Sequence, residues 1–174
     1  MTKAQYRFFA AYNSWANDLV YEAAAALPDA EYRADRGAFF KSVHGTLNHM
    51  VVADRVWMRR FTGSGPVQSR LDEILFETLP ELRLARKAED QRIIAYIDGL
   101  DEAALAGLFS YTTITDKKTI EQELSPALDH FFNHQTHHRG QIHCLLTMLT
   151  GSAPSLDMLH LQRSMGIGRS RASG

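Results

Sequence analysis

The chain has 174 residues, of which 45% are hydrophobic, and its 19 Lys and Arg residues nearly balance 20 Asp and Glu residues. A single domain of this length buries enough surface to fold without disulfides, and the lone Cys144 excludes an intramolecular disulfide and a cysteine-rich zinc module. The net charge of -1 argues against a nucleic-acid partner held by bulk charge. The N-terminal residues lack the unbroken apolar stretch of a secretory signal, and no segment is apolar for long enough to span a membrane. We therefore expect a cytoplasmic protein with neither a nucleic-acid nor a membrane partner.

Hydrophobic residues at helical spacing predict four long helices, which we place over residues 2–27, 42–61, 80–100 and 125–150. Thr2 is a suitable N-cap for the first of them, and Pro28 ends it. Ser125, followed by Pro126, has the composition of an N-cap and first turn for the last helix. Four long helices in one chain predict an all-α fold, a four-helix bundle.

The segments between the long helices predict smaller features. Residues 29–37 are charged and lack a periodic pattern, so we expect a loop there. Residues 109–124 place β-branched and aromatic residues on either side of a polar centre, which predicts a small hairpin inserted before the last long helix. A short amphipathic segment follows that helix. The single domain is expected to span residues 1–165, and the basic tail 166–174 to be disordered.

The second helix has a narrow polar strip on a surface that is otherwise apolar. His44, Asn48, Arg55 and Arg59 share this strip, and we expect them to face solvent while the rest of the helix is buried. Gly45 costs about 1 kcal/mol relative to alanine inside a helix, which indicates close packing at that position. The third helix is expected to be half-exposed, with its charged residues on the outer side.

Five of the eight histidines lie on the last long helix, at positions 130, 134, 137, 138 and 143. At about 100° per residue, His138 and His130 lie about 40° to either side of His134, within the apolar sector of the helix. His137 lies at the edge of this sector, and His143 points the opposite way. His134 and His138 therefore form an i, i+4 pair that is directed into the bundle.

Two imidazoles one helical turn apart can each place a nitrogen on one metal ion, at about 2.0–2.1 Å. The alternative is that each ring is hydrogen-bonded to a core partner, because an unpaired polar nitrogen is costly to bury. His49 has an inward phase on the second helix, and together with the pair it is the candidate third ligand. Three neutral imidazoles leave coordination positions open, which is typical of a catalytic site rather than a closed structural one.

The segment lacks two motifs that would indicate other chemistry. Gln135 follows His134, so the pair is not part of an H-E-x-x-H sequence, and Phe131 and Gln135 stand where di-iron bundles have glutamates. The candidates for a catalytic base are then His130, His137, Asp54 or the substrate itself. Asp54 and Gln141 are second-shell candidates that could orient a ligand imidazole; for Asp54, an ion pair with an arginine is the alternative.

The segment FNHQTHHRGQIHCLLT, together with SVHGTLNHMVVADRVW upstream, YNSWAND near the start and SLDMLHL near the end, resembles the DinB family over almost the whole chain. The resemblance implies a four-helix bundle with a long crossover connection and a divalent metal on three histidines, which fall on His49, His134 and His138. Related bundles include thiol-dependent transferases and an isomerase, which use low-molecular-weight thiols such as bacillithiol or mycothiol. The family also implies a homodimer.

The leading hypothesis is a divalent-metal-dependent enzyme, an S-transferase or hydrolase, that activates a low-molecular-weight thiol or water toward a small substrate. Zn or Ni is the expected metal, with Fe or Co as alternatives, because three imidazoles accept all four. The alternatives are a non-enzymatic stress-response bundle, in which the metal is structural or mediates association, and a metal-free interaction bundle. Arg59, Arg60 and Arg139 are candidate carboxylate partners, and Cys144 is expected to be a small buried thiol.

Overall fold

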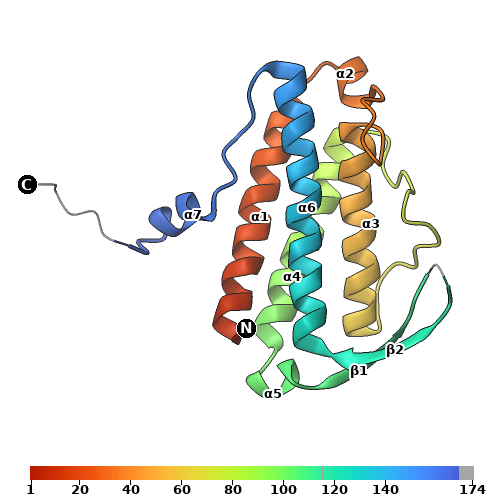
Figure 1. Ribbon diagram of the computed structural model, residues 1–174, viewed down its shortest axis with the longest axis vertical. Helices are drawn as coiled ribbons and strands as arrows, with labels where there is room; N and C mark the ends of the chain where they lie inside the picture. The colour runs from red at the N-terminus through yellow and green to blue at the C-terminus, as the bar shows by residue number, and fades with distance from the viewer. Residues whose placement is uncertain (115, 169–174) are drawn as a thin grey trace, which may run out of the picture.

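The computed structural model describes residues 1–114 and 116–168. Its four long helices are α1 (Lys3–Ala25), α3 (Val43–Thr62), α4 (Leu79–Gly99) and α6 (Leu124–Thr150) (Figure 1). Three short helices accompany them, α2 (Asp29–Arg33), α5 (Glu102–Leu105) and α7 (Met158–Ser164), with a hairpin of β1 (Leu108–Thr112) and β2 (Thr119–Glu123). This arrangement confirms the predicted all-α fold with a small hairpin before the last long helix.

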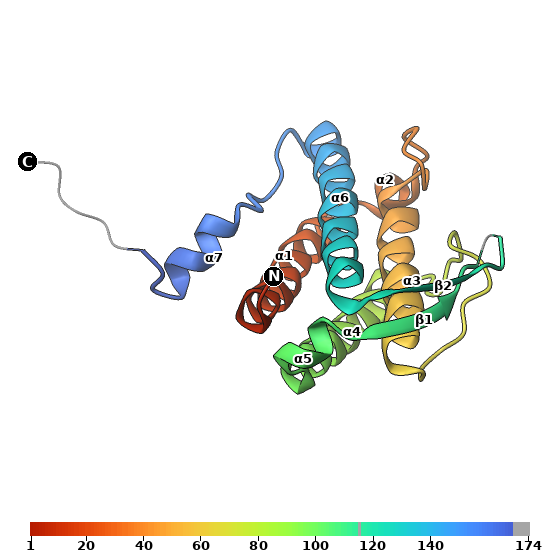
Figure 2. The same ribbon diagram turned by 60° about the horizontal axis from the view of Figure 1, so that its bottom comes forward.

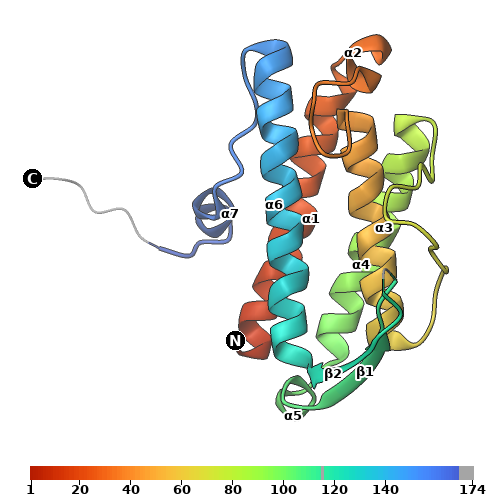
Figure 3. The same cartoon turned by 45° about the vertical axis from the view of Figure 1, so that its right-hand side comes forward.

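The four long helices form a bundle in which α1 and α3 each pack against both α4 and α6. In Figure 1, α1 and α6 run upward while α3 and α4 run downward, so α3 and α4 are parallel. The connection between them, residues 63–78, therefore has to return along the length of the bundle, as Figure 3 shows from the side. This is the long crossover connection that the sequence resemblance implied.

Side-chain and glycine caps set several of the helix ends. Thr2 and Gln5 form a capping box at the start of α1, and Ser42 accepts a hydrogen bond from the Gly45 amide at the start of α3. Gly63 and Gly151 end α3 and α6 in the left-handed conformation.

The predicted N-cap at Ser125 is wrong, because β2 leads directly into α6. The helix begins at Leu124, whose amide donates to the carbonyl of Gly107 at 3.0 Å. Ser125 consequently lies within the first turn.

Two short helices replace segments for which the sequence predicted no regular structure. Helix α2 lies inside the predicted loop 29–37, and α5 lies between α4 and the hairpin. Both have five residues or fewer, which is too short for an apolar period to be visible. In α2, an ion pair between Asp29 and Arg33 at 2.9 Å and the buried ring of Tyr32 hold the turn.

A small apolar cluster of Tyr12, Ala16 and Leu161 joins α1 to α7, and the rest of the core consists of two larger clusters separated by a layer of buried polar residues. One cluster lies around Val20, Leu47 and Ile142, and the other around Tyr6, Ile93 and Phe131. Between them, all four long helices contribute to what we call the polar layer: Asn13, Asn17, Asp54, Arg86, Asp90, Gln135 and Arg139. The expectation that the charged residues of the third helix are exposed is thus wrong for those in this layer, because they face partners of opposite charge.

The polar strip of α3 is also buried, contrary to the prediction, at His44 and Asn48. The crossover connection covers it and uses it for hydrogen bonds. The Asn48 side-chain oxygen accepts from the amides of Leu75 and Phe76 at 2.9 and 3.0 Å, and His44 Nε2 lies 3.0 Å from the Phe76 carbonyl oxygen. The strip therefore fixes the backbone of the connection along α3.

The hairpin lies across one end of the bundle, beside α3 and α6 (Figure 2). Its strands pair antiparallel from Leu108 opposite Glu123 to Thr112 opposite Thr119. Its half-buried face packs on α3, where Phe109 contacts Phe61 and Tyr111 contacts Trp57, with ring centroids 5.5 and 5.4 Å apart.

Two observations concern the outside of the bundle. Cys144 is exposed, so the predicted buried thiol is wrong: its neighbours on α6, Leu145 and Leu146, are the residues that face the core. Of the tail predicted to be disordered, residues 169–174 lie outside the described residues, and the described Gly166 and Ile167 hydrogen-bond back to α7.

Within the described ranges, no helix combines the length and apolar character required to cross a membrane.

Candidate metal centre

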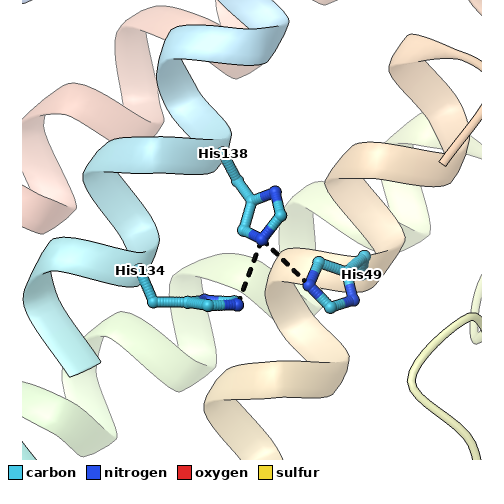
Figure 4. Close-up of side chains that lie close together, drawn as sticks. All are labelled: His49, His134 and His138. Carbon is cyan, nitrogen blue, oxygen red and sulfur yellow. Dashed lines mark hydrogen bonds between the residues drawn. The ribbon is translucent and has the colours of Figure 1, made fainter. Parts of the chain in front are cut away.

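Three histidines from two helices point toward one another, His49 from α3 and His134 and His138 from α6 (Figure 4). The Nε2 atom of His138 lies 3.1 Å from Nε2 of His49 and 3.1 Å from Nε2 of His134. All three ligand atoms lie within 4.8 Å of one another. Two nitrogens bound to one ion at about 2.0–2.1 Å lie at most about 4 Å apart, so the measured contacts suit a shared ion.

Hydrogen bonds at the opposite side of two of the rings fix which nitrogen is bare. His49 Nδ1 donates to the Leu71 carbonyl oxygen in the crossover connection at 2.7 Å, and His138 Nδ1 donates to the Gln141 side-chain oxygen at 2.8 Å. In a neutral imidazole the remaining nitrogen, Nε2, then carries a lone pair. Two lone pairs therefore face each other at 3.1 Å, an arrangement that a cation between them would satisfy.

The electrostatics of the cluster keep its rings neutral. Burial and the neighbouring imidazoles lower the pKa of His134 to about 3. Burial lowers the pKa of His138 to about 4, against the opposing effect of its hydrogen bond to Gln141, and also lowers the pKa of His49. Neutral imidazoles are the form that binds a metal, so the donor set fits a divalent transition metal.

Phe40 and the turn before α3 hold the His49 ring in place. The Phe40 ring stacks on the His49 imidazole, with centroids 3.7 Å apart and an interplanar angle of 15°. Lys41 has a φ of 68°, which turns the chain sharply between Phe40 and the helix. A Cβ atom at Gly45 would lie 2.1 Å from the Phe40 carbonyl oxygen, so the predicted close packing at this glycine is confirmed.

The polar layer sets the register between the two helices that carry the histidines. Gln135, next to His134 on α6, donates to Asp54 and to the Met50 carbonyl oxygen, both on α3. Asp54 is in turn 2.6 Å from Arg86 of α4. Among the described residues, the polar side-chain partners of Asp54 are Gln135 and Arg86, so the structure shows the ion pair with an arginine that was the alternative to a second-shell role.

The structure separates the remaining candidates. Gln141 contacts a ligand imidazole, as described above. His130 and His137 are both exposed, but His130 lines a cavity next to the cluster, whereas the His137 ring lies beside that of His138, with ring centroids 4.8 Å apart. Arg139 is buried in the polar layer, where it donates to Asn13 and Asn17, so it is not available to a ligand from solvent.

The cavity next to the cluster has a volume of about 230 Å³ and reaches two of the three histidines. Its lining consists of His49, Ala53, Val56, Trp57, Arg60, Leu71, Tyr111, Thr113, Ile114, His130 and His134. The sequence did not indicate Leu71, Tyr111 or Phe40 as parts of the site. They come from the crossover connection, the hairpin and the turn before α3. The packing of these segments against the bundle produces no periodic pattern in the sequence.

Comparison with known proteins shows the family to which the chain belongs. The family model described as the DinB family matches residues 1–169. The chain is also similar to Protein DinB of Bacillus subtilis (strain 168), with 27% identity over 161 residues, which cover 86% of this chain and 90% of that protein. The chain therefore belongs to the DinB family.

Proposed function

We propose that the protein is a divalent-metal-dependent enzyme that acts on a small substrate, with His49, His134 and His138 as the metal ligands. The convergence of three Nε2 atoms on one point is the observation that carries this proposal. A bound divalent ion supplies Lewis acidity, which lowers the pKa of a thiol or water at the same site. Reaction types that use this effect are transfer of a low-molecular-weight thiol and hydrolysis.

The open side of the cluster supports an enzyme rather than a purely structural ion. His49 and His134 form part of the wall of the cavity, so a molecule in the cavity lies beside two of the three candidate ligands. The apolar side chains of Ala53, Val56 and Leu71 exclude water from one side of this space.

His130 is the candidate for proton transfer. Partial burial and the nearby Arg60 lower the pKa of His130, so its imidazole is neutral at pH 7 and has a lone pair with which to accept a proton. It lies beside both Trp57 and His134, with ring centroids 5.1 and 5.8 Å apart. A group held in the cavity would therefore lie between the ligand nitrogens and a neutral base.

A structural role for the metal is the second candidate, because the three ligands join α3 to α6. Zn or Ni is the proposed metal, with Fe or Co as alternatives. A small-molecule substrate, a homodimer, a cytoplasmic location and the lack of nucleic-acid or membrane partners stay predictions.

Metal analysis of tag-free protein tests the ligand assignment. We expect about one divalent ion per chain in the wild type and a loss of most of it in His134→Ala. His143→Ala is the matched control, since it removes an imidazole from the same helix outside the cluster, and it should retain the metal. Unchanged metal content in His134→Ala would contradict the proposed site.

A second experiment separates the enzymatic from the structural reading. The cobalt-substituted protein is titrated with 2-mercaptoethanol while the visible spectrum is recorded, and thermal melts are run with and without chelator. New sulfur-to-cobalt absorption supports thiol activation. A large drop in Tm on chelation, with a spectrum that no thiol changes, favours the structural role.

A further inference from the structure

In the part of the chain that the structure describes, Arg60 is the arginine of α3 with neither a carboxylate nor a hydrogen-bond partner. Among the neighbouring arginines, Arg55 lies 3.9 Å from Glu89, and Arg59 donates to the Gly65 carbonyl oxygen at 2.6 Å. Within residues 1–114 and 116–168, Arg60 has neither a carboxylate within 4.0 Å nor a hydrogen-bond acceptor. Its guanidinium is thus half-buried without a charged partner from the protein, so its N–H groups are left to solvent or to a ligand.

Two aromatic rings hold the Arg60 guanidinium. Trp57 and Tyr111 contact each other at 5.4 Å with an angle of 60° between their planes, and Arg60 Cζ lies 4.5 Å from each ring centroid. The cation therefore rests in the corner that the two rings form. Cation–π contacts of this kind fix a guanidinium and leave its N–H groups free to donate.

The position of this cation connects it to the histidine cluster. Arg60 lies in the wall of the cavity that also contains His49, His134 and His130, and it is close enough to His130 to lower the pKa of that ring. A second, outer hollow shares part of its wall with this cavity, namely Val56, Arg60, Tyr111 and Ile114. Arg60 therefore stands between solvent and the cluster. An anion bound by Arg60 would thus have the rest of its molecule beside the cluster.

The lining of the cavity indicates which anion would fit. Arg60 is the only Lys or Arg among the described residues that line it, and His130 adds no charge at pH 7. Arg60 therefore supplies one positive charge to the cavity wall, beside the charge that an ion on the three histidines would add. A planar guanidinium with free N–H groups matches a carboxylate in two parallel hydrogen bonds. The remaining wall is largely aliphatic and aromatic.

We propose that Arg60 binds the carboxylate of a small monocarboxylic acid, whose hydrocarbon or aromatic portion occupies the cavity beside the three histidines. The assignment of this acid as the substrate rests on the proposed function; the binding of the carboxylate by Arg60 does not. The outer hollow gives such a molecule access from solvent.

Benzoate is the probe for this site, and ¹⁵N NMR titration of the protein as purified is the measurement. Benzamide tests the charge at nearly constant shape, and phenyl phosphate tests a dianion. Arg60→Gln removes the proposed partner, and Arg163→Gln is the matched control because it removes the same charge from an exposed position on α7, outside the lining of both hollows. Thermal melts of both variants establish that they fold.

The expected result is benzoate-dependent shifts at residues 57–60 and 111, with affinity at least tenfold weaker in Arg60→Gln and unchanged within about twofold in Arg163→Gln. Benzamide should bind wild-type protein at least tenfold more weakly than benzoate. The proposal is overturned by equal losses in both variants, by equal binding of benzamide, by tighter binding of phenyl phosphate, or by no shift at these residues. The comparison of benzoate with benzamide needs only wild-type protein, so it decides the question even if Arg60→Gln fails to fold.

A titration of His134→Ala separates this proposal from the proposed function. Retained benzoate binding in a variant that has lost its metal would show that the Arg60 site stands by itself. If metal analysis shows that the three histidines do not bind the metal, the benzoate titration still tests whether Arg60 binds a carboxylate. If the metal binds as expected and benzoate fails, only the Arg60 proposal falls.

Discussion

The Phe40 ring lies flat on the His49 imidazole, 3.7 Å away between centroids, although the two residues belong to different elements. The turn that presents Phe40 passes so close to α3 that only a glycine fits at position 45. The Phe40 ring also covers one face of the His49 imidazole, which is a candidate metal ligand. Local packing of the backbone at the start of α3 therefore determines the orientation of His49.

Gly45→Ala should destabilise the protein and weaken metal binding. The new Cβ atom would lie 2.1 Å from the Phe40 carbonyl oxygen, so the turn has to move, and overpacking of this kind costs about 1–3 kcal/mol. Gly140→Ala on α6 is the control: no atom lies within 4 Å of its added Cβ, and the better helix propensity of alanine should stabilise by up to about 1 kcal/mol. Urea denaturation measures the change in the free energy of unfolding in both variants. Equal effects of the two substitutions would contradict the role assigned to Phe40.

The three candidate ligands could be predicted from the sequence because helical phase is a local property. His134 and His138 share a face whatever the rest of the chain does, and His49 has an inward phase on its own helix. The partners of these rings could not be predicted in this way. The Leu71 carbonyl group reaches His49 only because the crossover connection docks along α3.

The same reasoning explains the errors about buried polar residues. The helical pattern predicts that polar residues such as His44 and Arg86 face solvent. Both side chains are instead buried against polar partners from other segments. A periodic pattern records which side of a helix is polar. It does not record whether water or another chain segment faces that side.

Gln141→Ala should reduce metal affinity without removing a ligand. The Gln141 oxygen accepts from His138 Nδ1 at 2.8 Å and so fixes the tautomer that exposes Nε2. Loss of such an outer partner typically lowers metal affinity by about 10–100-fold. Gln141→Glu retains an acceptor and should keep affinity near the wild-type value.

Competition with a chelating metal indicator measures these affinities. Asn133→Ala removes a comparable side chain from an exposed position on α6 and should have no effect. If Gln141→Ala binds metal as tightly as Asn133→Ala, the hydrogen bond to His138 has no part in the site.

Arg86→Met should be among the most destabilising single changes in the bundle. Arg86 lies 2.6 Å from Asp54 and 3.0 Å from Asp90, and its removal leaves two buried carboxylates without their nearest cation. Breaking a buried ion pair from one side costs about 3–5 kcal/mol.

Arg7→Met provides the comparison, because the pair of Arg7 with Asp98 is exposed and such pairs contribute at most about 1 kcal/mol. Chemical denaturation gives both values. Because the polar layer aligns α3 with α6, Arg86→Met should also weaken metal binding, whereas Arg7→Met should not. A similar, small loss of stability in both variants would remove the polar layer as a determinant of register.

The metal-free protein should lose stability as the pH falls below about 6.5. In the fold, the pKa of His134 is lowered to about 3 and that of His138 to about 4, whereas both rings titrate near 6.5 in an unfolded chain. Between these values the unfolded state binds more protons than the folded state, so the contribution of these rings is complete above pH 6.5 and is lost as the pH falls toward 4. Urea midpoints at pH 7, 6 and 5 in the presence of chelator measure this dependence. His134→Gln should flatten it, while His160→Gln, on α7 outside the cluster, should leave it as in the wild type. A pH dependence that is the same in all three proteins would mean that the buried imidazoles are not its source.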